Sequence, residues 1–218
     1  MSNNNVILLT GGSSGIGLFA VKELVKTSPG ATIVVASRTP PPNSFPGVHF
    51  RALDLCSDSS VRAFVKSYDC GPISSLVLNA GLFPSKGPTY TAPDTQSRRH
   101  ETALAASHIG HALLLYLLAA DKVLQPRCRL IFVTSALHDP RAPGAPAAPY
   151  WTSPEAADSA TDKRLASGAV RYANAKLAVV LFANALARKT KESKQWEILI
   201  FEPGFSPGGG SKLDRGKS

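Results

Sequence analysis

Cysteine is scarce in this sequence, and the cysteines present do not suit a disulfide framework or a zinc site. Only three, Cys56, Cys70 and Cys128, occur among 218 residues, and none belongs to a Cys-x-x-Cys or a Cys/His pattern with metal-ligand spacing. An odd number of scattered thiols fits a reducing compartment. We therefore expect a cytoplasmic protein without a metal site.

Long apolar runs and a targeting segment are also missing. The longest uninterrupted apolar stretch, Ala112 to Ala120, has nine residues, whereas a membrane span needs about 20. The first residues, Met1-Ser-Asn-Asn-Asn5, lack the basic region of a signal peptide, and the apolar run after them ends at Leu9. The sequence thus predicts a soluble protein with no membrane span.

Acidic residues are outnumbered by basic ones. There are 24 Lys and Arg against 15 Asp and Glu, which gives a formal net charge of +9. Such an excess can indicate a polyanionic partner, but the charges are scattered apart from short clusters such as Arg188-Lys189 with Lys191. A solvated basic surface is the favoured interpretation, and we expect no nucleic-acid partner.

Length and apolar pattern indicate one α/β domain. With about 150 residues per domain, two large domains are excluded. Strands buried on both faces that alternate with helices build a parallel, doubly wound sheet, here of about six strands with helices on both faces. The expected strands are 6–9, 32–36, 48–53, 76–78, 130–133 and 198–201, and the expected helices lie at about 16–26, 102–122 and 162–189.

Two proline-containing segments interrupt this alternation. Consecutive prolines in Thr39 to Pro46 forbid a helix and disfavour a paired strand, so we predict a surface loop there. The second segment, Leu137 to about Ala160, is long for a connection without its own regular structure. We interpret it as a candidate lid or substrate loop.

A glycine-rich stretch follows the first strand directly and leads into the first helix. Glycines let the backbone approach a pyrophosphate, and a helix N-terminus offers unpaired N–H groups. The spacing, Gly-x-x-x-Gly-x-Gly, could belong to an ordinary turn, but its place between strand and helix favours a dinucleotide phosphate cradle. The residues expected to form it are Gly11, Ser13, Ser14, Gly15, Ile16 and Gly17.

The end of the second strand indicates which dinucleotide is bound. An enzyme that uses NAD needs an acidic residue about 20 positions past the glycines, for the ribose 2′-hydroxyl. No Asp or Glu occurs between Glu23 and Asp54, whereas Ser37 could donate to a 2′-phosphate and Arg38 could bind it with its fork of donors. We predict NADP(H), the alternative for Arg38 being a solvated loop cation.

Taken in their order along the chain, the motifs resemble the short-chain dehydrogenase/reductase family, from about Val6 to Gly204. The stretch His108-Ile-Gly-His111 and the residues leading to His138 further resemble its retinol-dehydrogenase-like and fungal oxidoreductase branch. Besides the glycine-rich stretch, the resemblance rests on Asp54-Leu55, Leu78-Asn79-Ala80-Gly81, Ser135, Tyr172-Ala-Asn-Ala-Lys176 and Pro203-Gly204. It implies a Rossmann domain over residues 1–204 that binds NADP and carries the catalytic residues.

Tyr172 and Lys176 are four residues apart, so in a helix they project from one face. Lowering a phenol pKa from about 10 to about 7 needs about 4 kcal/mol of preferential stabilisation of the phenolate. Lys176 and an oxidised nicotinamide could supply it. The resemblance implies that Tyr172 is the general acid/base, that Lys176 also holds the nicotinamide ribose, and that Ser135 donates to the developing alkoxide. An aromatic ring packed on a lysine stem is the alternative.

The resemblance also assigns residues after the third and fourth strands to the cofactor. It places Asp54 at the adenine ring, and it places Asn79 near the adenine ribose or as a support of the central strand, with Gly81 beside it. Helix or turn capping is the alternative for both side chains, and Ser57 and Asp58 already supply candidate caps for the next helix.

The sequence departs from the family at two places. Ser107 stands where relatives have an Asn that helps a water-mediated proton relay. His108 and His111 are three residues apart, as metal ligands can be, but without a third ligand on a largely apolar helix they are expected to be packing or capping residues. Relatives continue past the Pro-Gly turn through a substrate-binding helical segment and a last strand, whereas residues 205–218 form a Gly/Ser-rich basic tail that we expect to be disordered. Gly209 there takes the place of a Thr that contacts the cofactor.

Two functions remain open at this stage. The first is an NADP-dependent oxidoreductase that transfers hydride between NADP(H) and a carbonyl or hydroxyl carbon of a small lipophilic or secondary-metabolite substrate. The alternative is a shortened, non-catalytic relative that binds a dinucleotide or a protein partner without turnover. In either case the resemblance suggests a homodimer formed through the helices at about 102–122 and 162–189.

Overall fold

The structure is a computed structural model that describes residues 5–84, 87–141, 148–153, 155, 158 and 162–204. The expectations for the basic tail and for Gly209 lie outside these residues. So does part of the loop from Leu137 to Ala160.

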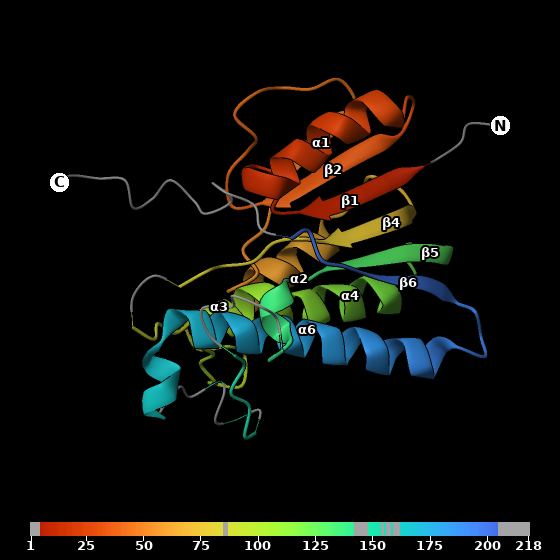
Figure 1. The fold of residues 1–218 in the computed structure, drawn as a ribbon. Helices are drawn as coiled ribbons and strands as arrows, with labels where there is room; N and C mark the ends of the chain where they lie inside the picture. Colours follow the sequence, from red (N-terminus) through yellow and green to blue (C-terminus); the bar gives the residue numbers. More distant parts are fainter. Residues whose placement is uncertain are drawn as a thin grey trace.

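Six parallel strands form one sheet in the order β3-β2-β1-β4-β5-β6 (Figure 1). The chain runs outward from β1 to β3 and then returns to β4, so the direction of winding reverses between β1 and β4. In such sheets ligands bind beyond the carboxyl ends of the strands at this reversal. The strands are β1 (Val6–Thr10), β2 (Thr32–Ser37), β3 (Val48–Ala52), β4 (Ile73–Leu78), β5 (Leu124–Val133) and β6 (Trp196–Phe201).

Helices cover the sheet on both faces, as predicted. On β1 and β2, alternate residues such as Leu8 and Val34 belong to the large core under α2, α4 and α6. Their neighbours Leu9 and Val35 pack against Val21 of α1. Because successive strand residues point to opposite faces, α1 lies on the face opposite the other helices (Figure 1). The longer helices are α1 (Gly15–Thr27), α2 (Asp58–Lys66), α4 (Gly110–Ala120) and α6 (Gly168–Thr190).

A π-helical turn interrupts the helical stretch that begins at Thr102. Here α3 (Thr102–Leu104) continues into the π turn η1 (Ala105–Ile109) and then into α4. Within the described residues, only the helical segment Thr102–Ala120 is long and apolar enough to cross a membrane by length and composition, and half of the window tested is buried inside the fold. The buried core helix of a globular domain has the same composition, so the absence of a membrane span stays a prediction.

The predicted helix over 162–189 is in fact two helices. A 3₁₀ turn, η3 (Lys163–Ala166), precedes α6, and Ser167 between them has extended backbone, with φ −69° and ψ 123°. The start of α6 lies so close to the chain after β4 that a Cβ on Gly168 would stand 1.9 Å from the carbonyl oxygen of Pro84. The break therefore lets the β4 loop pass directly over the first turn of α6.

The outer strand β6 is only partly covered. Its residues Trp196 and Ile198 pack against the core under α6. Leu199 and Phe201 alternate with them and point to the other face, where they are 40% and 50% exposed. On that face α1 packs over β1 and β2, which leaves the β6 side open.

Candidate active site

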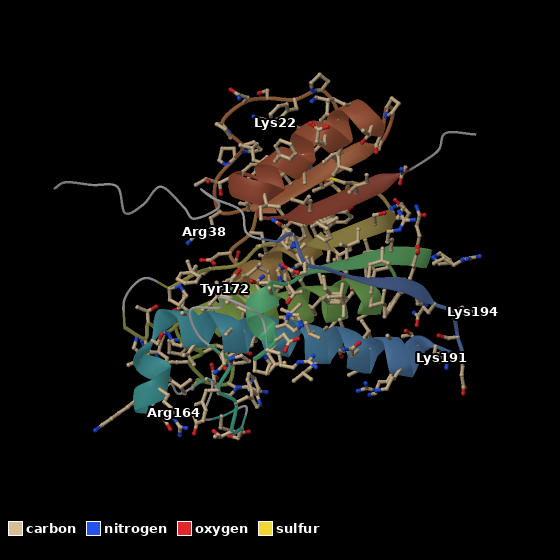
Figure 2. All side chains as sticks on the ribbon, viewed as in Figure 1. Lys22, Arg38, Arg164, Tyr172, Lys191 and Lys194 are labelled. Carbon is tan, nitrogen blue, oxygen red and sulfur yellow. The ribbon has the colours of Figure 1, made fainter. Side chains whose placement is uncertain are left out.

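The predicted site residues gather at one edge of the sheet. The phosphate loop follows β1, Ser37 and Arg38 come at and after the end of β2, and Asp54 follows β3. Asn79 and Gly81 follow β4, Ser135 follows β5, and Tyr172 and Lys176 lie on α6. Figure 2 shows Arg38 and Tyr172 at this end of the sheet, with Lys191 and Lys194 at the other end. Parallel strands bring their carboxyl ends to one edge, which explains how residues far apart in sequence meet here.

The phosphate loop between β1 and α1 depends on glycine at three positions. Gly11 and Gly15 have φ of +72° and +52°, a backbone region that favours glycine. A Cβ on Gly17 would lie 2.2 Å from the carbonyl oxygen of Gly11, so only glycine fits there. Ser14 is the N-cap residue of α1 but its side chain makes no capping hydrogen bond. Free N–H groups at the start of α1 can therefore serve an anion.

Thr10 connects the phosphate loop to the adjacent strand β4. Its hydroxyl oxygen accepts hydrogen bonds from the backbone N–H groups of Asn79 and Ala80, at 3.0 and 3.1 Å. The side-chain amide of Asn79 donates to the carbonyl oxygen of Thr10 at 2.9 Å. Asn79 therefore supports the central strands, one of the two roles expected for it.

His111 extends this network to the π turn. Its Nδ1 lies 3.1 Å from the carbonyl oxygen of Ser107, which can only accept, so Nδ1 carries the proton. Burial lowers the pKa of His111 to about 3, so the ring is neutral and Nε2 accepts from the Thr10 hydroxyl at 2.8 Å. One imidazole thus joins the entry of the phosphate loop to the backbone of the π turn. The sequence showed His111 only as a packing or capping residue.

The adenine end of the site carries Ser37, Arg38 and Asp54. The Ser37 hydroxyl donates to the carbonyl oxygen of Thr39 at 2.7 Å, so it must rotate before it can donate to a phosphate. Arg38 is exposed. The pKa of Cys56 is raised to about 11, mainly by burial. The charge of Asp54 adds to this rise, and the charge of Arg38 opposes it. Arg38 and Asp54 therefore both lie near Cys56.

Asp54 also has a local role in the turn before α2. One of its carboxylate oxygens accepts from the N–H of Cys56 at 2.9 Å. The cap of α2 is Ser57, whose hydroxyl accepts from the N–H of Ser60. Thus Ser57 supplies the cap that the sequence suggested, and Asp54 closes the turn beside it.

The structure brings Ser135, Tyr172 and Lys176 together between β5 and α6. The side chains of Ser135 and Tyr172 lie close enough for Ser135 to lower the pKa of the Tyr172 phenol. The ammonium of Lys176 lies 5.5 Å from the centre of the Tyr172 ring and donates to the carbonyl oxygen of Val133 at 3.0 Å. Thr134 donates to the carbonyl oxygen of Lys176 at 3.2 Å, which fixes α6 on the end of β5.

Burial controls the charges in this group. It raises the pKa of Tyr172 above its ordinary value near 10, and Ser135 opposes the rise. The lowered pKa expected from Lys176 together with an oxidised nicotinamide stays a prediction for the complex with the dinucleotide. Burial lowers the pKa of Lys176 to about 8. A buried ammonium here is ready to stabilise a negative charge placed beside it.

Ser107 and Gly81 lie directly beside Lys176. A Cβ on Gly81 would stand 3.2 Å from Nζ of Lys176 and 3.3 Å from Oγ of Ser107, so a side chain at this position would crowd both groups. Ser107 is 1% exposed, and its hydroxyl has no hydrogen-bond partner within the part of the chain that the structure describes. A water molecule or substrate group is the partner such a hydroxyl needs.

A buried ion pair next to Tyr172 holds the start of α6 in place. Arg171 donates to the carboxylate of Glu101 at 3.1 Å, and both side chains are 1% exposed. Arg171 also donates to the carbonyl oxygens of Leu165 and Ala166 in η3. The carboxylate of Glu101 in turn caps α3 through the N–H of Leu104. No local pattern could indicate this pair, since 70 residues separate its members.

Phe83 covers Tyr172 from the loop after β4. The two rings lie 5.0 Å apart at an interplanar angle of 48°, and Phe83 is 51% exposed. This loop is held over α6 by the close approach of Pro84 to Gly168. The phenol of Tyr172 therefore lies next to an exposed apolar ring.

His108 lies in the π turn, whereas His111 lies in the first turn of α4. His108 packs edge-on against Phe182, with ring centres 5.4 Å apart, and burial lowers its pKa to about 4. Across residues 5–204, leaving out the undescribed positions, no group of three His, Cys, Asp or Glu side chains could hold a metal ion. His108 thus has the packing role that was expected for it.

Comparison with known proteins adds the following matches. Residues 5–163 match the family described as short chain dehydrogenase. The chloroplastic protochlorophyllide reductase of Daucus carota is 36% identical over 143 residues, which are 59% of this chain and 35% of that protein. Retinol dehydrogenase 12 of Homo sapiens is 30% identical over 199 residues, which are 84% of this chain and 56% of that protein. The chain thus spans between about a third and about half of these relatives.

Solved structures share the fold. The 3-ketoacyl-(acyl-carrier-protein) reductase from Brucella melitensis, complexed with NADH, matches with a TM-score of 0.61 and 19% identity. The match covers 92% of this chain and 75% of that one. The six parallel strands and their helices therefore follow an arrangement that solved proteins also have.

Proposed function

The chain belongs to the short chain dehydrogenase family, and on this premise we propose that it transfers hydride between a nicotinamide dinucleotide and a carbonyl or hydroxyl carbon of a small molecule. The observation that carries the proposal is the meeting of Ser135, Tyr172 and Lys176 at the carboxyl edge of the sheet. The dinucleotide supplies the hydride chemistry when it is bound. Its phosphates fit the glycine cradle before α1, where a Cβ on Gly17 would collide with the backbone.

Tyr172, Ser135 and Lys176 have different roles at the reacting oxygen. Tyr172 keeps its proton near neutral pH, since burial raises its pKa, and can give that proton to the oxygen of a carbonyl as charge develops there. The Ser135 hydroxyl can donate a hydrogen bond to the same oxygen. Lys176 contributes a buried positive charge that stabilises the phenolate left on Tyr172.

Arg38 supports a preference for NADP(H) over NAD(H). It is exposed at the end of β2, and within the described residues it forms no ion pair that would occupy its guanidinium. We expect Arg38→Ala to weaken NADPH binding by about tenfold or more, the value of a charge-assisted contact, and to leave NADH binding nearly unchanged. Calorimetric titration of the original protein and of Arg38→Ala with each cofactor measures the ratio of NADPH affinity to NADH affinity. A ratio that Arg38→Ala leaves unchanged would refute the preference.

The same titration, followed by an assay of turnover, tests the proposed function itself. We expect the protein to bind reduced dinucleotide and to oxidise it in the presence of an aldehyde or ketone, as read from nicotinamide absorbance. Tight binding without turnover over a broad panel of carbonyl compounds would favour the non-catalytic alternative, for which Ser107 in place of Asn is the supporting observation. Absence of dinucleotide binding by a folded protein would contradict the oxidoreductase and leave the non-catalytic function, with a protein partner, in the lead.

Phe83 supports an apolar substrate. Its ring is half exposed and lies against Tyr172, so a carbonyl compound that reaches the phenol must also meet this ring. A lipophilic substrate gains from covering it, because apolar surface is removed from water.

Carbonyl reduction should depend on the charge of Lys176. Its pKa is lowered to about 8 by burial, so the ammonium is charged below pH 8 and loses its charge above it. Tyr172 remains protonated over this range, since its pKa is raised. We expect kcat for reduction to be level below about pH 8 and to fall above it, and Lys176→Met, although slow, to lack this fall. The measurement is kcat as a function of pH for the original protein and for Lys176→Met. A fall at the same pH in Lys176→Met would exclude Lys176 as the cause of the fall.

A further inference from the structure

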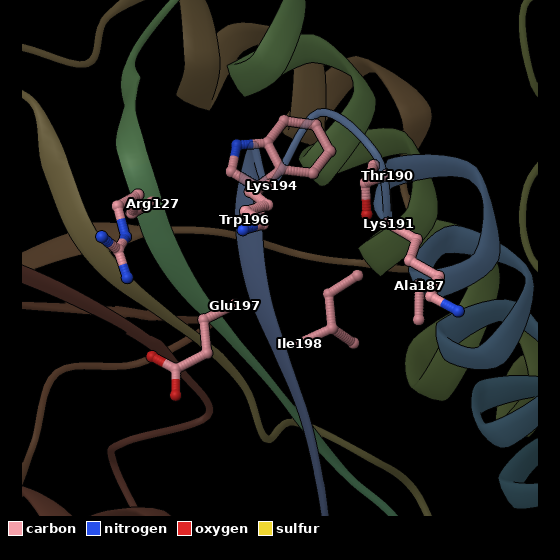
Figure 3. A pocket seen from close by; sticks show the side chains of 8 residues that line it. All are labelled: Arg127, Ala187, Thr190, Lys191, Lys194, Trp196, Glu197 and Ile198. Carbon is pink, nitrogen blue, oxygen red and sulfur yellow. The ribbon is translucent and has the colours of Figure 1, made fainter.

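A cavity lies at the end of the sheet away from the catalytic group, between the end of α6 and the start of β6. It has a volume of about 430 Å³ and is bordered by Thr190, Trp196 and Ile198 together with charged side chains. The charged residues that line it are Arg127, Lys191, Lys194 and Glu197. Figure 3 shows Trp196 near the start of β6, with Arg127 to one side of the strand and Lys191 to the other. Figure 2 shows how far Lys191 and Lys194 lie from Tyr172.

The three basic residues of this cavity have no carboxylate partner. Among the described residues none of Arg127, Lys191 and Lys194 forms an ion pair, and the single acid of the lining, Glu197, is paired with Arg129 at 3.1 Å. Glu192 in the same loop is exposed and also lies outside the described ion pairs. Three cations therefore border one cavity while its only carboxylate is already neutralised. Like charges held together repel each other, so the arrangement favours an anionic occupant.

Two residues that line the cavity have a strained backbone, as do Ser97 and Lys122 elsewhere in the described residues. Arg127 and Lys194 have φ of +62° and +48°, in the left-handed region that disfavours any residue with a Cβ. Glycine would adopt this conformation without strain, yet both positions carry a cation. The backbone N–H of Arg127 donates to the carbonyl oxygen of Gln195 at 2.8 Å, and that of Lys194 donates to Thr190 at 3.0 Å. These bonds connect the first half of β5 to the turn that follows α6, beside the cavity. Cations at two strained positions of one site indicate that their charges have a functional role, such as binding an anion.

We propose that this cavity binds the phosphate groups of a ligand that carries at least two of them, such as a diphosphate. Three unpaired cations suit two linked phosphates better than a single one, because the second phosphate adds negative charge that one phosphate cannot supply. Trp196 is partly buried against the core and also lines the cavity, so its indole can report on an occupant. The site lies at the amino ends of β5 and β6, so it is separate from the phosphate loop at the carboxyl ends.

Pyrophosphate is the probe for this site, and Trp196 is the reporter. The chain has two tryptophans, so Trp151→Phe leaves Trp196 as the only indole. In that background we expect pyrophosphate to change Trp196 fluorescence in a saturable way, at constant ionic strength, and inorganic phosphate to bind at least about tenfold more weakly. Saturating NADPH should not compete. Competition would assign the signal to the phosphate loop and overturn the proposal, as would the absence of a saturable change.

Lys194→Gly separates a binding role from a structural one. Removing the ammonium should weaken pyrophosphate binding by about tenfold or more, since a contact to a charged group is lost. Relief of the left-handed strain should at the same time raise Tm by about 2 to 4 °C. Lys189→Gln, which removes a cation on α6 outside the cavity, should leave binding unchanged. Unchanged binding in Lys194→Gly, or an equal loss in Lys189→Gln, would show general attraction to a basic surface and overturn the proposal.

A diphosphate may be free in solution or lie at a lipid surface, and both sources share the chemistry proposed here. Sedimentation with phosphatidylcholine vesicles, with and without a phosphatidylinositol bisphosphate, distinguishes them. Pyrophosphate binding without vesicle binding identifies a soluble ligand. Binding to the bisphosphate vesicles that Lys194→Gly abolishes and pyrophosphate displaces identifies a lipid headgroup. Vesicle binding that neither change affects is general surface attraction and leaves only the soluble ligand.

Discussion

Tyr172→Phe should lower kcat for carbonyl reduction by about 10²- to 10⁴-fold, the contribution of a positioned general acid. The phenol lies beside Ser135 and can deliver a proton to the reacting oxygen. The ring itself stays in place, since Phe retains the packing against Phe83 and the stem of Lys176. Dinucleotide affinity should therefore remain within about twofold, and single-turnover kinetics should locate the loss in the chemical step.

Tyr116→Phe is the matched control for this experiment. Tyr116 lies on α4 with 69% of its surface exposed, and its hydroxyl faces solvent away from the site. It should keep the kcat of the original protein. Full turnover in Tyr172→Phe would remove Tyr172 from its role as the acid, and a loss of dinucleotide binding would show that the hydroxyl acts in binding.

Arg171→Met should lower the free energy of unfolding by about 3 to 5 kcal/mol, because the buried carboxylate of Glu101 is left without its partner. Arg171 also satisfies two carbonyl oxygens of η3, and these lose their donor in the variant. The change lies one residue before Tyr172, so the start of α6 should loosen as well. Urea denaturation followed by circular dichroism measures the effect.

Two comparison variants show that the loss comes from an unpaired buried charge. Glu101→Leu combined with Arg171→Met removes both charges and should recover much of the stability. Arg129→Met breaks the exposed pair with Glu197, in which both side chains are about half exposed, and should change stability by less than about 1 kcal/mol. If Arg171→Met is as mild as Arg129→Met, the Arg171–Glu101 pair does not hold α6 in place.

Most of the fold could be predicted from the sequence because its strands are short apolar runs between clear helical patterns. All six strands lie where they were expected, and the match to the short chain dehydrogenase family confirms the resemblance. The break before α6 could not be predicted. It depends on the contact between Gly168 and Pro84, which are distant in sequence and which no local pattern connects.

The candidate site divides in the same way. Glycine spacing pointed to the phosphate loop, and the four-residue spacing pointed to Tyr172 and Lys176. The supporting contacts were missed because each joins segments far apart in sequence. His111 reaches Thr10 across 101 residues, and Arg171 reaches Glu101 across 70. Burial of Tyr172, which raises its pKa, could not be predicted either, since burial is a property of the folded chain.

The outer edge of β6 determines how the protein behaves as it is concentrated. Within the described residues this edge has no neighbouring strand, and exposed Leu199, Ile200 and Phe201 lie along it. An apolar edge of this kind can pair with an extended segment of another molecule. The net charge of +9 opposes such encounters by mutual repulsion. Added salt screens that repulsion, so the protein will stay dispersed at low ionic strength and aggregate as salt is raised.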